Sequence, residues 1–272
     1  MKPTERQRLR ALFGEDAERY ERARPTYPSA VFDDLAAFGH LAPGSRVLEI
    51  GCGTGQATLP LAEHGYCVVA VELSPEMAGV ARRKLAHFPR VQVVVAAFEE
   101  WLLPEEPFDA VVSATAFHWI DPEVRVQRSV AALRPAGTLA TISTHHIAGG
   151  DEAFFAKAQS CYERWDPLTP PGLRLEQPDE IPTDAAELSD SGLFDAPTFR
   201  RDEWDQQYTA ASYRDVLLTY SNHRALAPPS QSGLLDCITT LIQTSYGGRI
   251  SKRYMTELRM ARKTAPHDSP IG

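Results

Sequence analysis

Three glycines that follow a short apolar run are the residues of this sequence best suited to hold a ligand. The run covers 47–50, glycine recurs at Gly51, Gly53 and Gly55, and 56–64 is compatible with a helix. Because glycine has no Cβ, it adopts backbone dihedrals that other residues avoid and lets a ligand lie against the main chain. A strand, a glycine turn and a helix in this order predict the opening of a ligand-binding βαβ unit.

Three kinds of ligand are compatible with such a turn. A phosphate loop requires a lysine after the glycines, and Gln56, Ala57 and Thr58 supply none. A dinucleotide site has the spacing Gly-x-Gly-x-x-Gly, whereas this turn has Gly-x-Gly-x-Gly. The third ligand is S-adenosylmethionine, which has no phosphates and carries a positive sulfonium. The residues disfavour the first two ligands more than the third.

Two carboxylates accompany the turn. Glu72 lies near the end of a second predicted strand, 67–73, and in a βαβ unit its carboxylate would lie beside the turn and accept hydrogen bonds from ribose hydroxyls. It could also stabilise the N-terminus of a helix over 75–86. Glu49 lies inside the apolar first strand, where an unpaired carboxylate is costly. It could bind turn amides, the amino end of the ligand, or a buried structural partner.

Histidines at the ends of later strands could move a proton. His118 follows the fourth predicted strand, 108–114, and His145 and His146 follow the fifth. Imidazole titrates near neutral pH, and ligands of parallel sheets bind at the carboxyl ends of the strands. We therefore predict His118 and His145 as catalytic residues, with a place in the pocket wall as the alternative for His118. His223 is a weaker candidate.

The order of the predicted elements indicates the fold. Near-continuous apolar strands that alternate with helices are typical of a parallel sheet covered on both faces. The predicted strands of this part are 46–50, 67–73, 91–97, 108–114 and 138–144. After Thr144 the pattern changes to helices at 151–165, 184–191, 211–223 and 229–246, strands at 197–208 and 252–262, and a proline-rich loop at 166–183.

This pattern predicts a modular organisation. An N-terminal arm with lid helices covers 1–40, and the cofactor-binding half of an α/β domain covers 41–144. A helical cap that forms the substrate region comprises 145–195 and 209–250, and the closing strands of the same sheet comprise 196–208 and 251–263.

Composition excludes several function classes. The 272 residues carry a formal net charge of -8, which argues against non-specific binding to nucleic acid or to anionic membranes. The N-terminus has no apolar core of a signal peptide, and no apolar run reaches the roughly 18 residues of a membrane span. The four cysteines form no Cys-x-x-Cys pair, which predicts buried thiols in a reducing compartment and no metal site. We expect a cytoplasmic monomer or homodimer.

Residues 47–55, VLEIGCGTG, resemble motif I of the class I S-adenosylmethionine-dependent methyltransferases. The resemblance covers about 13–144 and continues in the family's order through 71–77, 108–113, 117–121 and 133–139. It implies a Rossmann-like α/β fold, with a seven-stranded, mostly parallel sheet whose last strand is antiparallel and a helical cap inserted after the fifth strand. It also implies S-adenosyl-L-methionine as cofactor and S-adenosyl-L-homocysteine as product.

The resemblance also implies roles for particular residues. Gly51 and Gly53 would lie under the methionyl part, Glu72 would bind the ribose, and Leu73 would contact the adenine. Ala97 stands where the family often has an aspartate that reads the adenine amino group, so Phe98 through its amide, or Glu99, would take over. Tyr20 and Arg24, with Tyr27, resemble an N-terminal lid, or form an extended connector. The expected cofactor contacts are Tyr20, Arg24, Glu49, Gly51, Gly53, Glu72, Leu73, Ala97, Phe98 and Ser113.

The favoured hypothesis is an enzyme that transfers a methyl group to a small organic acceptor. The alternative is a protein that binds S-adenosylmethionine without methyl transfer, either a cyclase or a regulatory partner. Its supports are Ala97 and the absence of an obvious base. A nicotinamide dehydrogenase is disfavoured by the glycine spacing.

Overall fold

The computed structural model describes residues 16–264, and these form two compact units. Unit 1 contains 16–25, Thr144–Pro182 and Glu203–Met255, and unit 2 contains Thr26–Ser143, Thr183–Asp202 and 256–264. Residues 1–15, the first part of the predicted arm over 1–40, and residues 265–272 lie outside the described residues.

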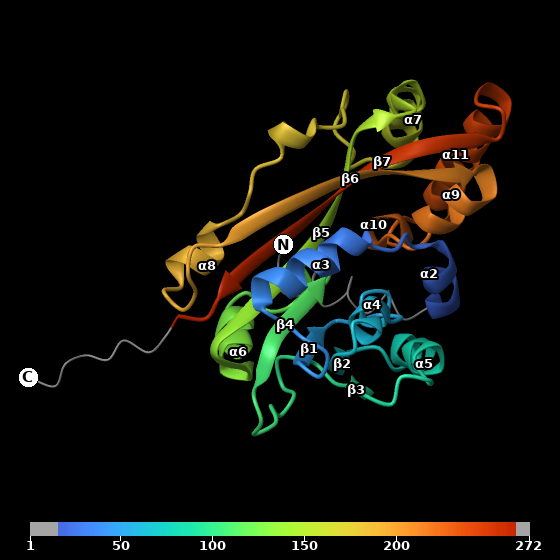
Figure 1. The fold of residues 1–272 in the computed structure, drawn as a ribbon. Helices are drawn as coiled ribbons and strands as arrows, with labels where there is room; N and C mark the ends of the chain where they lie inside the picture. Colours follow the sequence, from blue (N-terminus) through green and yellow to red (C-terminus); the bar gives the residue numbers. More distant parts are fainter. Residues whose placement is uncertain (1–15, 265–272) are drawn as a thin grey trace, which may run out of the picture. The chain divides into compact units, whose positions relative to one another are not determined.

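A seven-stranded sheet has the strand order β3-β2-β1-β4-β5-β7-β6 (Figure 1). Its strands are β1 (Arg46–Ile50), β2 (Cys67–Glu72), β3 (Val91–Val95), β4 (Phe108–Ala114), β5 (Leu133–Gly150), β6 (Thr198–Thr209) and β7 (Arg249–Arg262). Strands β3, β2, β1, β4 and β5 are parallel to one another, and β7 is the antiparallel strand. The predicted fold class is therefore confirmed.

Both faces of this sheet are apolar in unit 2. On one face, side chains of β1, β2 and β4 pack with α3 (Ser29–Gly39) and α4 (Thr58–Glu63). The helices contribute Phe32, Leu35 and Leu61 to this contact. On the other face, further side chains of the same strands pack with α6 (Arg125–Ala132) and α8 (Ala186–Asp190). Continuous apolar strands such as β1 and β4 follow from this double burial.

Helix α5 (Pro75–Lys84) begins as its sequence predicts. The Ser74 hydroxyl accepts a hydrogen bond from the Met77 amide at 3.2 Å, and proline occupies the first helical position. Both devices satisfy or remove backbone donors that a helix leaves open at its start. This cap fixes the point where β2 ends, immediately after Glu72.

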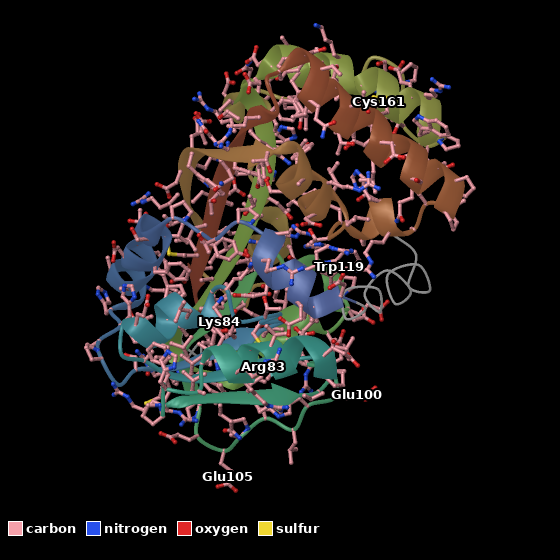
Figure 2. The ribbon with its side chains drawn as sticks, turned by 90° about the vertical axis from the view of Figure 1, so that its right-hand side faces the viewer. Arg83, Lys84, Glu100, Glu105, Trp119 and Cys161 are labelled. Atoms are coloured by element: carbon pink, nitrogen blue, oxygen red, sulfur yellow. A yellow bond between two sulfur atoms is a disulfide. The ribbon has the colours of Figure 1, made fainter. Side chains whose placement is uncertain are left out.

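Unit 1 is largely helical. It contains α2 (Ala17–Ala23), α7 (Glu152–Trp165), η3 (Pro178–Glu180), α9 (Ala210–Leu217), α10 (Ser221–Arg224) and α11 (Pro228–Ser245). A disulfide joins Cys161 of α7 (labelled in Figure 2) to Cys237 of α11. The prediction of a thiol was wrong for this pair, because the fold brings together two cysteines that lie 76 residues apart. Cys52 and Cys67 are free thiols.

Several predicted boundaries differ from the structure, and two of these differences change an element. Strand β5 begins at Leu133 instead of 138, because a register shift against β4 accommodates Pro135–Gly137 within the strand, with Ala136 at φ +56°. It also continues to Gly150. The helix expected at 211–223 is two helices, α9 and α10, separated by a turn in which the Thr219 hydroxyl donates to the Val216 carbonyl at 2.6 Å.

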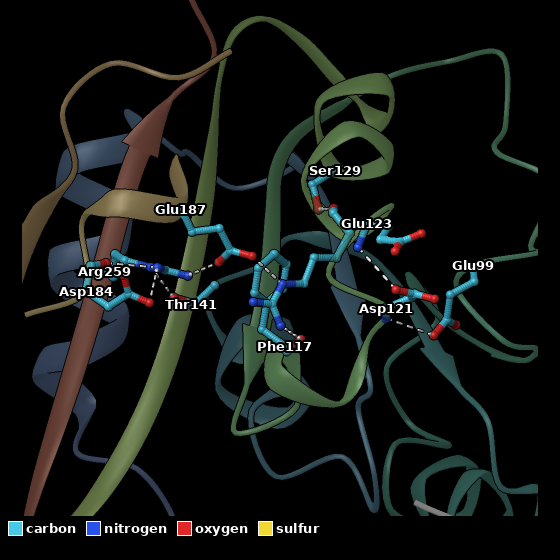
Figure 3. A network of polar contacts seen from close by, with 10 residues as sticks. Glu99, Phe117, Asp121, Glu123, Ser129, Thr141, Asp184, Glu187 and Arg259 are labelled. Carbon is cyan, nitrogen blue, oxygen red and sulfur yellow. Dashed lines mark hydrogen bonds and ion pairs between the residues drawn. The ribbon is translucent and has the colours of Figure 1, made fainter. Parts of the chain in front are cut away.

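A polar network crosses unit 2 between β5, β7, α6 and α8 (Figure 3). Arg259, which is 8% exposed, donates to Thr141 Oγ1 at 3.1 Å and to the Asp184 carbonyl at 2.9 Å. It also pairs with Glu187, which binds Arg125. A buried guanidinium needs such partners, so this network is structural. No helix within 16–264 is long and apolar enough to cross a membrane.

Candidate cofactor and active site

The glycine turn lies at the carboxyl ends of β1 and β2 and requires glycine for two reasons. Gly51, Gly53 and Gly55 have φ values of +70°, +57° and +84°, which other residues rarely adopt. A Cβ on Gly51 would also lie 2.5 Å from the Cβ of Ala116, in the segment after β4. The amides of Gly51 and Cys52 both donate to the Val71 carbonyl, at 2.8 and 3.2 Å. The turn is therefore fixed between the ends of β2 and β4.

Glu72 lies against this turn. Its Oε2 accepts a hydrogen bond from the Gly53 amide at 2.9 Å, and its Oε1 accepts one from the Ser74 amide at 2.8 Å. The strand register explains the position, because Ile50 pairs with Val71 and the next residue of β2 therefore reaches the turn. Each carboxylate oxygen can accept a second bond. Glu72 thus presents fixed acceptors at the turn, as a ribose diol requires.

Glu49 is the buried carboxylate of the site, with 1% of its surface exposed. Desolvation, together with the nearby charge of Glu72, raises its pKa to about 7. Among the described residues, no hydrogen-bond partner reaches its Oε2. A buried carboxylate oxygen without a hydrogen bond costs free energy of folding. A cationic donor such as an ammonium group on a ligand would supply that bond.

The residues expected around the adenine differ in character. Leu73 is an apolar side chain that is 38% exposed directly after Glu72. Ala97 offers no polar group, and its carbonyl accepts from the amides of Glu100 and Trp101. Phe98 is buried, and its carbonyl accepts from Arg128 at 2.9 Å, so only its amide is left to contact a ligand.

Glu99, the expected substitute for the missing aspartate, accepts a bond from the Asp121 amide at 3.3 Å (Figure 3). This contact joins the segment after β3 to the segment after η2 (Phe117–Trp119). The carboxylate therefore has a structural role in addition to any contact with a ligand.

The carboxyl end of β4 contributes residues of two kinds. Ser113 is fully buried, and its hydroxyl donates to the Ile50 carbonyl at 3.0 Å, so its side chain holds β4 against β1, and its contact with a cofactor stays a prediction. Thr115 has φ +50°, and its hydroxyl shares a 3.0 Å hydrogen bond with the Tyr27 hydroxyl. A threonine in this conformation is strained. The sequence did not indicate Thr115, because backbone strain leaves no mark on residue type here.

His118 lies in η2, just after β4, with its ring 4.8 Å from the Trp119 ring. Partial desolvation, followed by the charge of Arg125, lowers the pKa of His118 below its usual value of 6.5. The imidazole is therefore neutral at pH 7. A neutral imidazole can accept a proton, so this residue has the protonation state that a general base needs.

Three of the predicted residues belong to unit 1. Tyr20 is in α2, Arg24 follows it, and His145 is in β5. The Arg24 guanidinium lies 5.1 Å from the centre of the Tyr20 ring and donates to the Thr219 carbonyl at 3.2 Å. Their contacts with a cofactor and the catalytic role of His145 stay predictions.

The donor and acceptor set of unit 2 fits S-adenosylmethionine. The turn leaves no side chain between its backbone and a ligand, Glu72 supplies acceptors for a diol, and Glu49 supplies a buried acceptor for an ammonium. Leu73 adds an exposed apolar surface for an aromatic base. No lysine follows the glycines, as a phosphate ligand would require.

Comparison with known sequences agrees with this fit. A family model described as a methyltransferase domain matches residues 47–137. An uncharacterized methyltransferase of Mycobacterium tuberculosis is 39% identical over 130 residues, which are 48% of this chain and 51% of the relative. An uncharacterized methyltransferase-like protein of Schizosaccharomyces pombe is 34% identical over 131 residues, covering 48% and 50%. The chain spans about half the length of the curated relatives it matches.

Comparison with solved structures concerns the fold. A type II methyltransferase candidate from Anaeromyxobacter dehalogenans superposes with a TM-score of 0.59 at 23% identity, covering 89% of this chain and 99% of the other. The YcgJ protein of Bacillus subtilis superposes with a TM-score of 0.53 at 17% identity, covering 86% and 98%. The family model identifies residues 47–137 as a methyltransferase domain, and the motifs are those of the class I S-adenosylmethionine-dependent type.

Proposed function

We propose that the chain transfers a methyl group from S-adenosylmethionine to a small organic acceptor. The observation that carries this proposal is the pair of carboxylates at the glycine turn, Glu49 and Glu72, one buried with an open acceptor and one fixed on the Gly53 amide. Glu49 binds the ammonium of the methionyl part, Glu72 the ribose and Leu73 the adenine. When bound, the cofactor supplies a methyl group on a sulfonium that leaves as a neutral thioether.

The chain's own residues contribute binding, orientation and proton transfer. Methyl transfer needs the acceptor atom held in line with the methyl carbon, so positioning supplies most of the rate. A base is required only when the acceptor must lose a proton. His118, neutral at pH 7, takes that proton, and His145 is the second candidate.

The acceptor is a small molecule in this proposal. The net charge of -8 is unfavourable for nucleic acid as a substrate. We assign acceptor binding to the predicted cap, 145–195 and 209–250, which contains α7, α9, α10 and α11. The cytoplasmic location and the monomeric or homodimeric state expected from the sequence are parts of the same proposal.

Calorimetric titration with S-adenosylhomocysteine tests the cofactor half. We expect the wild type to bind and Glu72→Ala to lose at least about tenfold in affinity, because two hydrogen bonds to an ionised acceptor are removed. Glu63→Ala is the matched control, since Glu63 is an exposed carboxylate on α4. Unchanged affinity in Glu72→Ala would refute the cofactor placement.

Incubation with methyl-labelled cofactor and a panel of small alcohols, amines and carboxylic acids tests the transfer half. Label in a product supports methyl transfer, whereas tight cofactor binding without any labelled product favours the non-transferring alternative. His118→Gln should lower the rate by about 10²–10⁴-fold without changing cofactor affinity. His87→Gln, which changes an exposed histidine of the same unit, should leave both unchanged.

A further inference from the structure

Unit 1 buries a lysine that the proposed cofactor chemistry does not use. Lys252 of β7 is only 4% exposed, and its ammonium lies 4.6 Å from the centre of the Tyr254 ring and 5.5 Å from that of Tyr220. A lysine is almost never buried unless it is paired. Its surroundings therefore require an explanation.

The partners of Lys252 do not neutralise its charge. Within 16–264 its one hydrogen-bond acceptor is the Tyr220 hydroxyl, at 3.3 Å, and no carboxylate there forms an ion pair with it. An ammonium has three donors, so two remain for another acceptor. Aromatic faces stabilise a cation by less free energy than burial of an unpaired charge costs.

A second cation lies on the same phenol. The Arg24 guanidinium is 4.4 Å from the centre of the Tyr220 ring. Burial alone would raise the pKa of Tyr220, but the charges of Lys252 and Arg24 lower it below its usual value. Two positive charges therefore lie beside one phenol, Lys252 at its hydroxyl and Arg24 over its ring.

Neighbouring groups add further polar atoms. The hydroxyls of Tyr208 and Tyr254 share a 2.9 Å hydrogen bond. His146 lies against Tyr254, with 6.3 Å between ring centres, and its buried Nε2 has no partner among the described residues. Burial, followed by the charge of Lys252, lowers the pKa of His146 to about 2, so this imidazole is neutral. It can serve as a hydrogen-bond donor or acceptor for a ligand.

From this arrangement we infer that Lys252, Arg24 and Tyr220 form a binding site for the anionic group of a small molecule. An anion bound there would occupy the open donors of Lys252. This site goes beyond the proposed methyl transfer and does not depend on it.

The test uses the full chain and three probes: benzoate, succinate and inorganic phosphate. We expect at least one to bind the wild type in calorimetric titration and to raise its Tm. Lys252→Met should weaken that binding by at least about 30-fold, because it removes the buried charge. It should also raise the Tm without ligand, since an apolar side chain of similar length replaces an uncompensated ion.

Two further variants separate a binding role from a structural one. Lys157→Met removes an exposed lysine of unit 1 that also lies near a tyrosine ring, Tyr246, and should leave probe binding unchanged. Tyr220→Phe keeps the ring face but removes the hydroxyl, and should weaken binding less than Lys252→Met. If no probe binds the wild type, or if Lys252→Met binds as tightly, the inference is overturned.

The same samples distinguish failure of the inference from failure of the proposed function. Titration with S-adenosylhomocysteine reports on Glu72 and should give the same affinity in Lys252→Met and wild type. Cofactor binding with no anion response would remove the anion site and leave the methyltransferase proposal intact. Anion binding without cofactor binding would support the anion site and refute the methyltransferase proposal.

Discussion

At the glycine turn of unit 2 the buried or half-buried charges are carboxylates, Glu49 and Glu72, and no described residue pairs with Oε2 of Glu49. In the polar cluster of unit 1 they are Lys252 and Arg24, with open donor positions on the lysine. A charged group without a full set of partners costs free energy of folding. Such a group is typical of a site where a ligand of opposite charge binds and supplies the missing partner. The contrast indicates a cationic ligand for unit 2 and an anionic one for unit 1.

The largest expected effect is at the glycine turn. Gly51→Ala should abolish S-adenosylhomocysteine binding and destabilise the protein, because the new Cβ meets Ala116 at 2.5 Å and φ is +70°. Gly44→Ala, at φ +94° but with no atom within 4 Å of a new Cβ, should cost only about 1 kcal/mol and leave binding intact. If the double variant Gly51→Ala with Ala116→Gly restores no binding, the clash is not the cause.

The disulfide should stabilise unit 1 and leave the cofactor site unaffected. Its loop of 76 residues corresponds to about 4 kcal/mol of unfolded-state entropy. Cys161→Ser with Cys237→Ser should therefore lower the free energy of unfolding by about that amount. Dithiothreitol should reproduce the loss in the wild type and have no further effect on the variant. Cys67→Ser is the control, since Cys67 is a free thiol of unit 2. An equal response to the reductant in the double variant would contradict this assignment.

Glu49 should make the stability of unit 2 depend on pH. Its folded pKa of about 7 lies above the ordinary value of 4.5, so the stabilising difference is present below pH 4.5 and is lost as pH rises through 7. The full loss is about 3 kcal/mol. Denaturant titrations at several pH values should show this decline in the wild type and a flatter profile in Glu49→Gln. A bound ammonium ligand favours the ionised carboxylate, so cofactor affinity should instead rise between pH 6 and 8. If wild type and Glu49→Gln show the same dependence of stability on pH, a group other than Glu49 causes the decline.

The smallest effect is expected for the bond between Tyr27 and Thr115. Tyr27→Phe removes one hydroxyl from a 3.0 Å hydrogen bond and should cost about 1 kcal/mol of stability. Denaturation midpoints measure this loss. Tyr27→Phe on a Thr115→Val background should cost nothing more, and a full additional loss there would show that the two hydroxyls act independently.

Much of unit 2 could be predicted from sequence, because its information is local. Strand, glycine turn and the carboxylate at the end of the next strand lie within 47–72, and a βαβ unit brings them together. The seven-stranded fold followed from the motifs, and it is confirmed. Ser113 shows the limit, since a motif position does not reveal that its hydroxyl donates to the neighbouring strand.

The cluster of unit 1 could not be predicted, because its members come from distant segments. Arg24, Tyr220 and Lys252 meet only after α2, α10 and β7 have packed, and no short motif contains them. The disulfide has the same origin. His145 and His146 are adjacent in sequence, yet the sequence favoured His145, whereas the imidazole with the buried unpartnered nitrogen is that of His146.

The crosslink also bears on what proteolysis would do to the chain. Leu168 and Leu173 are 90% and 59% exposed in the loop after α7, and side chains of this kind are accessible to proteases. Both lie between Cys161 and Cys237, inside the covalent loop. A cut there would leave the two fragments joined as one molecule, and they would separate only after the sulfurs are reduced. A nicked preparation would therefore run as an intact chain on a non-reducing gel.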